Sequence, residues 1–287
     1  MKKTTNNSER KVDTIYIISK GRPECKTART LIELGYPGEW FIVCGTNDET
    51  LPQYKENYGD HVLVFDWAEQ IKHTDVMDNF GFEKMPSGAA PVRNAVFDFS
   101  RARGEVRHWQ LDDDFTGFYL TNTSLTKNVH IKSGKIFYYW MHRIAQFADD
   151  AKLANVGFKL KLESFPGDAK SFSRRIYAAH NMSNEGLTPE WRGRFNDDTI
   201  NAIDTQRLGQ QKEMQLKFLS INTPVTQQDP GGLTDMYKTL GTVRKTAYLI
   251  LLAPNAAKLV IHFGRYHHSV VWKNLIPELI AEKWRKR

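Results

Sequence analysis

The sequence has few cysteines and no long hydrophobic run. Cys25 and Cys44 are the only cysteines among 287 residues, and they do not have the spacing of a CxxC motif. Two thiols cannot complete a four-ligand zinc site, and so few exclude a disulfide-rich secreted scaffold. The longest apolar run, from Ala247 to Ala253, ends before Pro254 and is far shorter than the roughly 20 residues of a membrane-spanning helix. A zinc finger, a small disulfide module and a membrane-spanning protein are therefore excluded.

Targeting signals, repeats and a strong excess of one charge are also lacking. Residues 1–12 are basic and polar and no small-residue cleavage site follows them, so we expect a flexible N-terminus on a protein of the reducing cytoplasm. No internal repeat or low-complexity linker divides the chain. The 40 Lys and Arg residues stand against 33 Asp and Glu, a formal net charge of +7. This excess favours a polyanionic partner, although many basic proteins bind no nucleic acid.

Material for a folded core is abundant. Hydrophobic residues make up 40% of the chain, with 7 Trp, 11 Tyr and 16 Phe. Short β-rich runs alternate with helical stretches at 14–19, 24–34, 40–44, 62–65, 91–103 and 106–111. This alternation is typical of βαβ units, so we expect an α/β fold with a parallel sheet at its core.

The pattern becomes mixed beyond Phe115. A helix is predicted over 134–152, strands near 156–162, 171–177 and 214–221, and another helix after Gly232. Because no linker intervenes, we expect a single domain over 13–273, with halves at 13–114 and 115–273. A basic C-terminal helix is expected over 274–287, and residues 75–90 have the weak periodicity of a mobile loop beside the site.

Three aspartates directly follow the strand expected over 106–111. Ligands of open α/β sheets bind at such carboxyl ends. Alternate residues on an extended backbone point the same way, so Asp112 and Asp114 can converge on one cation. Carboxylates that act together with substrate phosphates suit Mg²⁺ or Mn²⁺. The alternative for Asp112, Asp113 and Asp114 is a solvated acidic turn or a helix cap.

Two further segments carry groups suited to a phosphorylated ligand. The first ends the first predicted strand and comprises Ser19, Lys20, Gly21 and Arg22. Gly21 permits a tight turn there and the cations can face a nucleotide, although a generic strand-to-helix loop has the same pattern. Arg93 and Asn94 begin a predicted helix, where backbone N–H groups, the helix dipole and a guanidinium all favour a diphosphate.

The second half offers three more candidates. Asp197 and Asp198 begin a predicted helix, as a general base or as a helix cap. Gly231 and Gly232 precede another helix and permit close approach of the backbone to a sugar or phosphate, as does any bland turn. Among histidines, His267 and His268 are adjacent on a predicted strand and face opposite ways, so at most one of them can be a metal ligand.

Taken in order, six segments resemble GT-A-fold glycosyltransferases. They are ISKGRP, PVRNAVFD, QLDDD, RFNDDTIN, QQDPGG and GRYHHSV, and they span residues 13–275. Specifically, they resemble the phage-encoded TET/JBP-associated glycosyltransferases, which are related to the base J glucosyltransferase. The resemblance implies a Rossmann-type nucleotide-sugar-binding sheet continued by a mixed α+β acceptor-side half.

The resemblance also implies an activity and its location. A sugar would move from a nucleotide sugar, expected to be UDP-linked, to the hydroxymethyl group of a modified pyrimidine in DNA, such as 5-hydroxymethylcytosine. The reaction would depend on Mg²⁺ or Mn²⁺ and take place in the cytoplasm of an infected bacterial host. A GT-A transferase acting on a glycan or protein, and a catalytically inactive nucleic-acid-binding module, remain the alternatives.

Carried across residue by residue, the resemblance assigns roles to the candidates. Donor binding falls to Ser19, Lys20, Gly21, Arg22, Arg93, Asn94, Asp112, Asp113, Gly231 and Gly232. The metal falls to Asp114 and Asp112, with His267 or His268 completing its shell. Asp198, or in second place Asp197, would deprotonate the acceptor hydroxyl. Basic pairs in the acceptor-side half form the expected DNA-binding surface: Arg174, Arg175, Arg192 and Arg194.

Overall fold

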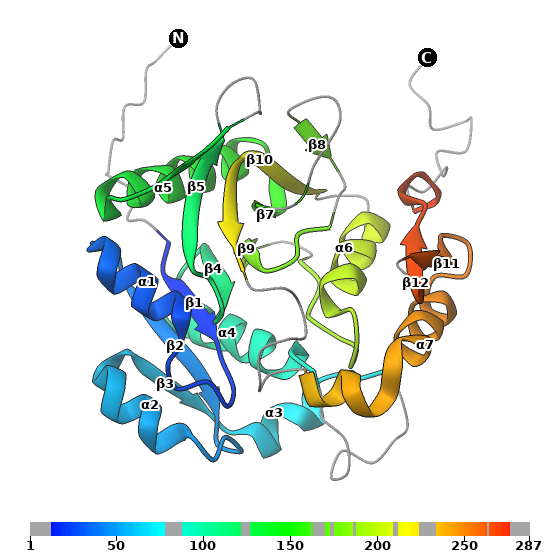
Figure 1. The fold of residues 1–287 in the computed structure, drawn as a ribbon, viewed down its shortest axis with the longest axis horizontal. Helices are drawn as coiled ribbons and strands as arrows, with labels where there is room; N and C mark the ends of the chain where they lie inside the picture. The colour runs from blue at the N-terminus through cyan, green and yellow to red at the C-terminus, as the bar shows by residue number, and fades with distance from the viewer. Residues whose placement is uncertain are drawn as a thin grey trace.

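A ten-stranded sheet forms the centre of the computed structural model (Figure 1). The structure describes residues 13–77, 88–121, 127–161, 163, 170–172, 175–185, 188–208, 212–223, 234–262 and 264–275. The sheet comprises β1 (Ile15–Ile18), β2 (Trp40–Gly45), β3 (Val62–Phe65), β4 (Arg107–Asp112), β5 (Gly117–Thr121), β6 (Asn128–His130), β7 (Leu153–Leu160), β8 (Lys170–Phe172), β9 (Ala179–Ser183) and β10 (Lys212–Asn222). The helices are α1 (Lys26–Leu34), α2 (Leu51–Tyr58), α3 (Trp67–His73), α4 (Ala90–Ala102), α5 (Gly134–Asp150), α6 (Asp197–Leu208) and α7 (Thr234–Leu252).

The strand order is β3-β2-β1-β4-β9-β7-β10-β5-β6, with β8 paired to β10. Strands β3, β2, β1 and β4 are mutually parallel, whereas β9 is antiparallel to β4 and begins a mixed half. This topology confirms the expected α/β fold, with a Rossmann-type parallel part continued by a mixed part. The chain leaves β1 toward β2 on one side and returns to β4 on the other, which makes the β1/β4 junction a topological switch point.

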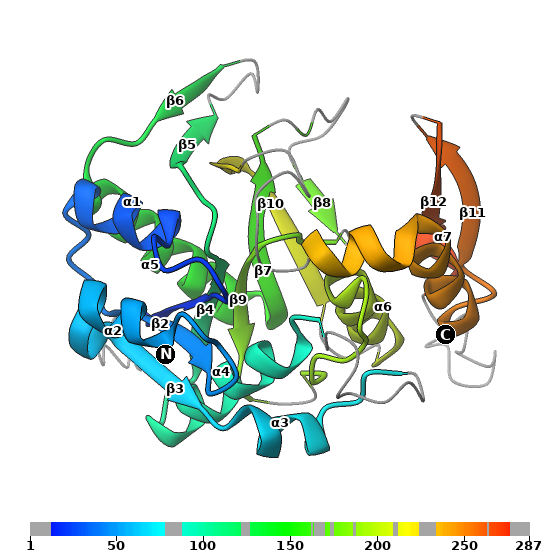
Figure 2. The ribbon, with the colours of Figure 1, turned by 60° about the horizontal axis from the view of Figure 1, so that its bottom comes forward.

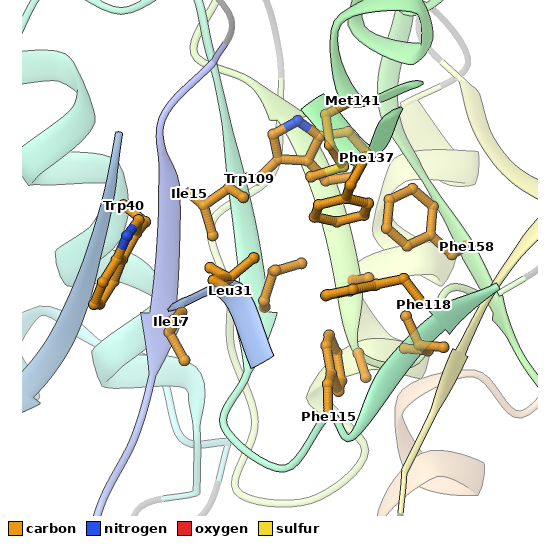
Figure 3. Close-up of a cluster of buried hydrophobic side chains, with 14 of the residues drawn as sticks. Ile15, Ile17, Leu31, Trp40, Trp109, Phe115, Phe118, Phe137, Met141 and Phe158 are labelled. Carbon is orange, nitrogen blue, oxygen red and sulfur yellow. The ribbon is translucent and has the colours of Figure 1, made fainter. Parts of the chain in front are cut away.

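Helices cover both faces of the sheet at β1, which is why this strand is apolar throughout. Ile15 and Ile17 pack with α1 and α5, whereas Tyr16 and Ile18 pack with α4. Figure 3 shows the first of these clusters, in which residues of β1, β4 and α5 meet. Within it, the rings of Phe118 and Phe137 stack with their centroids 3.9 Å apart. Burying side chains of this size stabilises the fold by about 1.5–3 kcal/mol each.

Residues 234–275, which we call the C-terminal unit, lie beside α6 (Figures 1 and 2). The unit contains α7, which is broken at Gly241, the hairpin of β11 (Ala257–His262) and β12 (Arg265–Val270), and a 3-10 turn over Trp272–Asn274. A small apolar cluster joins it to α6 through Ile200 and Leu249. None of the helices in the described ranges is long and apolar enough to cross a bilayer.

Several sequence expectations fall on residues that the structure does not describe. These are the N-terminus over 1–12, most of the expected loop at 75–90, and most of the C-terminal helix expected over 274–287. Both cysteines, Cys25 and Cys44, are buried and unbonded, and burial raises the pKa of each thiol. They are core residues in the parallel half.

Candidate functional site

The candidate site lies where β1 and β4 end side by side. Their register pairs Ile18 with Asp112, so the residues that follow each strand are neighbours. Ser19 Oγ donates to Asp113 Oδ2 at 2.5 Å, and Arg22 Nη1 lies 2.8 Å from Asp113 Oδ1. Asp113 is therefore buried in a structural contact with the first loop. These contacts distinguish Asp113 from Asp112 and Asp114, the two members of the triplet that the sequence assigns to a cation.

The loop after β1 is held by its neighbours. Gly21 adopts a φ of 67°, which favours glycine, and its N–H donates to Asp48 Oδ2 at 2.9 Å. The N–H of Arg22 donates to the Tyr54 hydroxyl at 2.9 Å, and that hydroxyl lies 2.5 Å from Ser19 Oγ. The loop is thus rigid, with Lys20 exposed on it. Tyr54 was not among the sequence candidates, since a tyrosine in a helix has no signal of its own.

Arg93 is the central residue of the site. It lies in the first turn of α4, and its side chain is only 4% exposed. Its Nη2 donates to Asp112 Oδ1 and its Nε to Asp197 Oδ2, both at 2.9 Å. The guanidinium lies over the Trp191 ring, 4.6 Å from its centroid. Arg93 therefore joins the acidic motif after β4 to the acidic motif at the start of α6.

One donor of this guanidinium remains unused. Arg93 Nη1 is buried and has no hydrogen-bond partner among the residues that the structure describes. A buried N–H of a charged group without a partner is costly, so such groups are normally paired with protein, water or ligand. The unpaired Nη1 therefore marks a position where a ligand oxygen can be bound.

The environment of Asp112 opposes its negative charge. Burial raises the pKa of Asp112 to about 8; Arg93 counteracts this rise, whereas Asp114 and Asp197 add to it. One third of the side chain remains exposed, so Asp112 stays accessible to a ligand. A divalent cation at this position would favour the carboxylate form, because a bound cation is the largest charge in such a site.

Asp198 is held in a different way from Asp197. Its Oδ1 accepts from the Thr199 N–H at 2.6 Å, and its Oδ2 lies 3.7 Å from Arg175 Nε. Arg175 Nη1 donates to Thr199 Oγ1 at 2.6 Å. Asp197 Oδ2 is held in the buried contact with Arg93, and its side chain is 10% exposed. Asp198 is more accessible, with 19% of its side-chain surface exposed. Of the two, Asp198 is the carboxylate that an acceptor hydroxyl can reach.

The two candidate histidines have different surroundings. His268 Nε2 lies 3.1 Å from Arg175 Nη1 and accepts from it. Burial, together with Arg175, lowers the pKa of His268 to about 4, so the ring is neutral. His267 pairs with Val260 across the hairpin and lies on its opposite face. The structure thus brings His268 to Asp198 through Arg175.

Two carboxylates at the end of β4 are the candidate ligands for a divalent cation. In the parts of the chain that the structure describes, no three His, Cys, Asp or Glu residues are grouped to hold a metal ion. Asp112 and Asp114 lie at alternate positions at the end of β4, close enough for Asp114 to raise the pKa of Asp112. Mg²⁺ is commonly held by one or two carboxylates with water and substrate phosphates. Two carboxylates therefore fit a cation that binds together with a diphosphate.

Some residues expected to bind the donor form hydrogen bonds within the protein. Asn94 Nδ2 donates to the Trp191 carbonyl and its Oδ1 accepts from the Trp191 N–H, both at 2.8 Å. Asn94 thus fixes the segment that carries Trp191, and its expected place near the donor stays a prediction. The sequence could not reveal this because the two residues are distant in the chain. Gly231 and Gly232 lie outside the described residues.

The four arginines expected to form a DNA-binding surface do not share one exposed surface. Arg194 is buried, and Arg192 makes two hydrogen bonds to Asp204, at 2.7 and 2.8 Å. Arg175 lies within the site beside Asp198, and Arg174 is outside the described residues. The sequence shows charges but not their partners, so it could not place these arginines in such different surroundings. A separate cavity of about 540 Å³, lined by Arg192, Asp204 and Trp191, contains none of the candidate acids.

The model of the TET-Associated Glycosyltransferase family matches residues 14–231, and no curated protein matches the chain. A solved structure of CMP:2-keto-3-deoxy-manno-octonic acid synthetase complexed with CTP is similar at 8% identity and a TM-score of 0.39, covering 81% of this chain and 99% of that one. The family match includes the first loop, Arg93 and both acidic motifs. The chain therefore belongs to the TET-associated glycosyltransferase family and is a glycosyltransferase.

Proposed function

We propose that the protein transfers a sugar from a nucleotide sugar, UDP-linked, to the hydroxymethyl group of a modified pyrimidine in DNA. One observation carries the proposal: Arg93 binds Asp112 and Asp197 at 2.9 Å each. This contact unites a donor-side acidic motif with an acceptor-side acidic motif in one buried cluster. Transfer between two substrates requires such a meeting point, because the reacting atoms must be held about 3–3.5 Å apart. The membership of a glycosyltransferase family supports the reaction class.

The donor side would be formed by the ends of β1 and β4. The rigid loop with Lys20 and Arg22 would face the nucleotide, and Asp112 and Asp114 would hold Mg²⁺ or Mn²⁺ at its diphosphate. The cation would neutralise the charge that develops on the departing diphosphate. Arg93 Nη1, which has no partner among the described residues, would donate to a donor oxygen. Burial makes such a preorganised donor more effective than the same group in water.

The acceptor side would be centred on Asp198. The Thr199 N–H holds Oδ1, and Oδ2, which lies 3.7 Å from Arg175 Nε, would take the proton of the acceptor hydroxyl. As that oxygen forms its bond to the anomeric carbon, the bond from this carbon to the diphosphate breaks and the diphosphate leaves with the electron pair. Asp197 would not act as the base, because Arg93 already occupies its Oδ2.

The proposal is tested by product analysis. The full chain is incubated with Mn²⁺, a panel of nucleotide sugars and oligonucleotides carrying 5-hydroxymethylcytosine or 5-hydroxymethyluracil, and the nucleosides are then analysed by mass spectrometry. We expect one sugar on one hydroxymethylated base and none on the unmodified base. Asp198→Asn is the matched variant, and it should bind the donor but yield little product. Hydrolysis of a nucleotide sugar without any DNA product would favour a glycan or protein acceptor instead.

A further inference from the structure

The excess of positive over negative charge in this protein arises at one end of the chain. Residues 1–233 contain thirty Lys and Arg and thirty Asp and Glu, whereas residues 234–287 contain ten and three. The whole formal charge of +7 thus arises after residue 233. The family match ends at residue 231, before this basic part begins. The C-terminal unit, residues 234–275, holds six of the ten basic residues and one acid.

The C-terminal unit is attached directly to the acceptor side of the site. Asn196, which immediately precedes α6, donates from Nδ2 to the Lys245 carbonyl at 2.9 Å. The N–H of Arg194 donates to the Tyr248 hydroxyl at 3.2 Å. His268 of the hairpin contacts Arg175, which in turn lies beside Asp198. One face of the hairpin is therefore linked through His268 and Arg175 to Asp198, the carboxylate proposed to deprotonate the acceptor hydroxyl.

The two faces of the hairpin differ in chemistry. Strands β11 and β12 pair Leu259 with His268 and Ile261 with Tyr266, and cross-strand partners share a face. The His268 face therefore continues outward as an apolar stripe in which Leu259, Ile261 and Tyr266 are 53%, 68% and 47% exposed. The other face carries the exposed Lys258 and Arg265. Exposed apolar side chains of this size on one short hairpin indicate a binding surface.

The exposed apolar stripe and the basic side chains of the hairpin together fit a nucleic-acid strand. Proteins that bind unpaired strands combine basic side chains that follow the phosphates with aromatic and apolar side chains on which bases stack. A protein or glycan partner would account for the apolar stripe but not for the restriction of the entire net charge to this end. An acceptor base that has left its stack also exposes its neighbours to such a stripe, because extruding a base opens the duplex.

We propose that the β11–β12 hairpin binds the acceptor nucleic acid, with Lys258 and Arg265 on phosphates and Ile261 and Tyr266 against the bases that flank the modified one. The modified base then enters beside Asp198, at the His268 end of the same face. This inference rests on the proposed DNA acceptor and adds the element that holds it. It proposes a surface different from the four arginines expected from the sequence, of which Arg194 is buried and Arg192 is paired with Asp204.

The test measures DNA binding by the full chain. Fluorescence anisotropy with a labelled hydroxymethylated oligonucleotide, single-stranded and duplex, compares the parent with Lys258→Glu/Arg265→Glu. The control is Lys132→Glu/Lys135→Glu, which makes the same change of charge at two exposed lysines before and in α5. We expect the hairpin variant to bind at least tenfold more weakly at low salt, with a salt slope reduced by roughly two. The control should stay within about threefold of the parent, and thermal unfolding reports whether each variant is folded.

Tyr266→Ala separates base contacts from charge. We expect about tenfold weaker binding with an unchanged salt slope, because stacking involves no counterion release. If both hairpin variants bind like the parent while the parent still glycosylates DNA, the hairpin assignment is overturned and the DNA acceptor stands. Equal losses in the hairpin and control double variants would likewise overturn it, since general charge would explain the result. A parent that neither binds nor modifies DNA would refute the proposed function itself.

Discussion

Arg93 donates from Nη2 to Asp112 Oδ1 across 2.9 Å beside the topological switch point between β1 and β4. The guanidinium is almost completely buried, whereas the carboxyl keeps one third of its surface exposed. A buried charge is costly unless it is paired, so this arginine depends on Asp112 and Asp197 as much as they depend on it. The three side chains therefore act as one structural unit, and removing any one leaves the others uncompensated.

Arg93→Met should lower the free energy of unfolding by roughly 3–5 kcal/mol, the usual cost of removing one partner of a buried ion pair. Urea denaturation at neutral pH measures the change. Arg101→Met, an exposed arginine near the end of the same helix, is the control and should cost less than about 1 kcal/mol. Equal effects of the two changes would show that the buried contacts of Arg93 add no stability.

Asp198→Asn should lower the rate of transfer, whereas Asp197→Asn should lower the stability of the fold. Loss of a general base lowers the rate of transfer by about 10²–10⁴ while leaving the ground state intact, so Asp198→Asn should reduce kcat with little change in donor affinity. Asp197→Asn disturbs the contact with Arg93 and should instead lower the unfolding free energy. Steady-state kinetics, donor calorimetry and urea titration distinguish them. Weak donor binding in Asp198→Asn would place this acid in the nucleotide site.

Asp114→Asn should weaken the binding of Mn²⁺ in the presence of UDP by roughly tenfold or more, because one of two hard oxygen donors is lost. Isothermal titration calorimetry measures this affinity without any turnover. Asp60→Asn removes an exposed acid outside the site and serves as the control. A metal affinity that is unchanged in Asp114→Asn would remove this residue from the proposed cation site, and full transfer in chelator would remove the cation from the reaction.

Glu213 should make stability depend on pH. Burial raises the pKa of this carboxyl from 4.5 to about 8, so the folded protein holds a proton that the unfolded chain releases between these values. The free energy of unfolding therefore falls as pH rises from about 5 to 8, by up to roughly 1.4 kcal/mol per pH unit. Glu213→Gln should flatten this dependence relative to the parent. Urea titrations at a series of pH values measure the difference, and parallel curves would show that Glu213 titrates normally.

The side chain of Glu213 explains why glutamine is the suitable replacement. Its Oε1 accepts from the Ile176 N–H at 2.9 Å and its Oε2 from Asn155 Nδ2 at 3.1 Å. Asn155 Oδ1 has no partner among the described residues, so a glutamine amide can donate to it after a small rotation. Glu213→Ala, by contrast, should destabilise the protein at every pH, because it leaves the Ile176 N–H buried without an acceptor.

Local patterns predicted the parallel half well. The expected helices at 24–34 and 91–103 correspond to α1 and α4, and the strand at 106–111 corresponds to β4 within one residue at each end. Strand β5 was not predicted, because its identity comes from antiparallel pairing with β10, about a hundred residues later. Such pairing is a property of the tertiary structure and leaves no periodic signal in a short window.

For the site, the sequence identified most of the polar residues but not their contacts. Arg93, Asp112 and Asp197 were all candidates, yet the expected role of Arg93 at the diphosphate did not include its two buried carboxylate partners. Trp191, which lies under the guanidinium, had no signal, since a single tryptophan in a polar segment is not distinctive. Motifs give the types of residue at a site, whereas distances between segments are set by packing.

The antiparallel pairing of β4 with β9 also determines how long β4 stays unpaired while the chain is being synthesised. Strand β4 is almost entirely buried, but its outer partner ends at Ser183, some seventy residues later in the chain. A nascent chain that emerges N-terminus first therefore exposes an unpaired apolar edge until β9 has left the ribosome, and such edges invite pairing between molecules. Truncation after the acidic triplet would leave this edge permanently unpaired. We therefore expect the parallel half, cut at residue 114, to aggregate when it is produced alone.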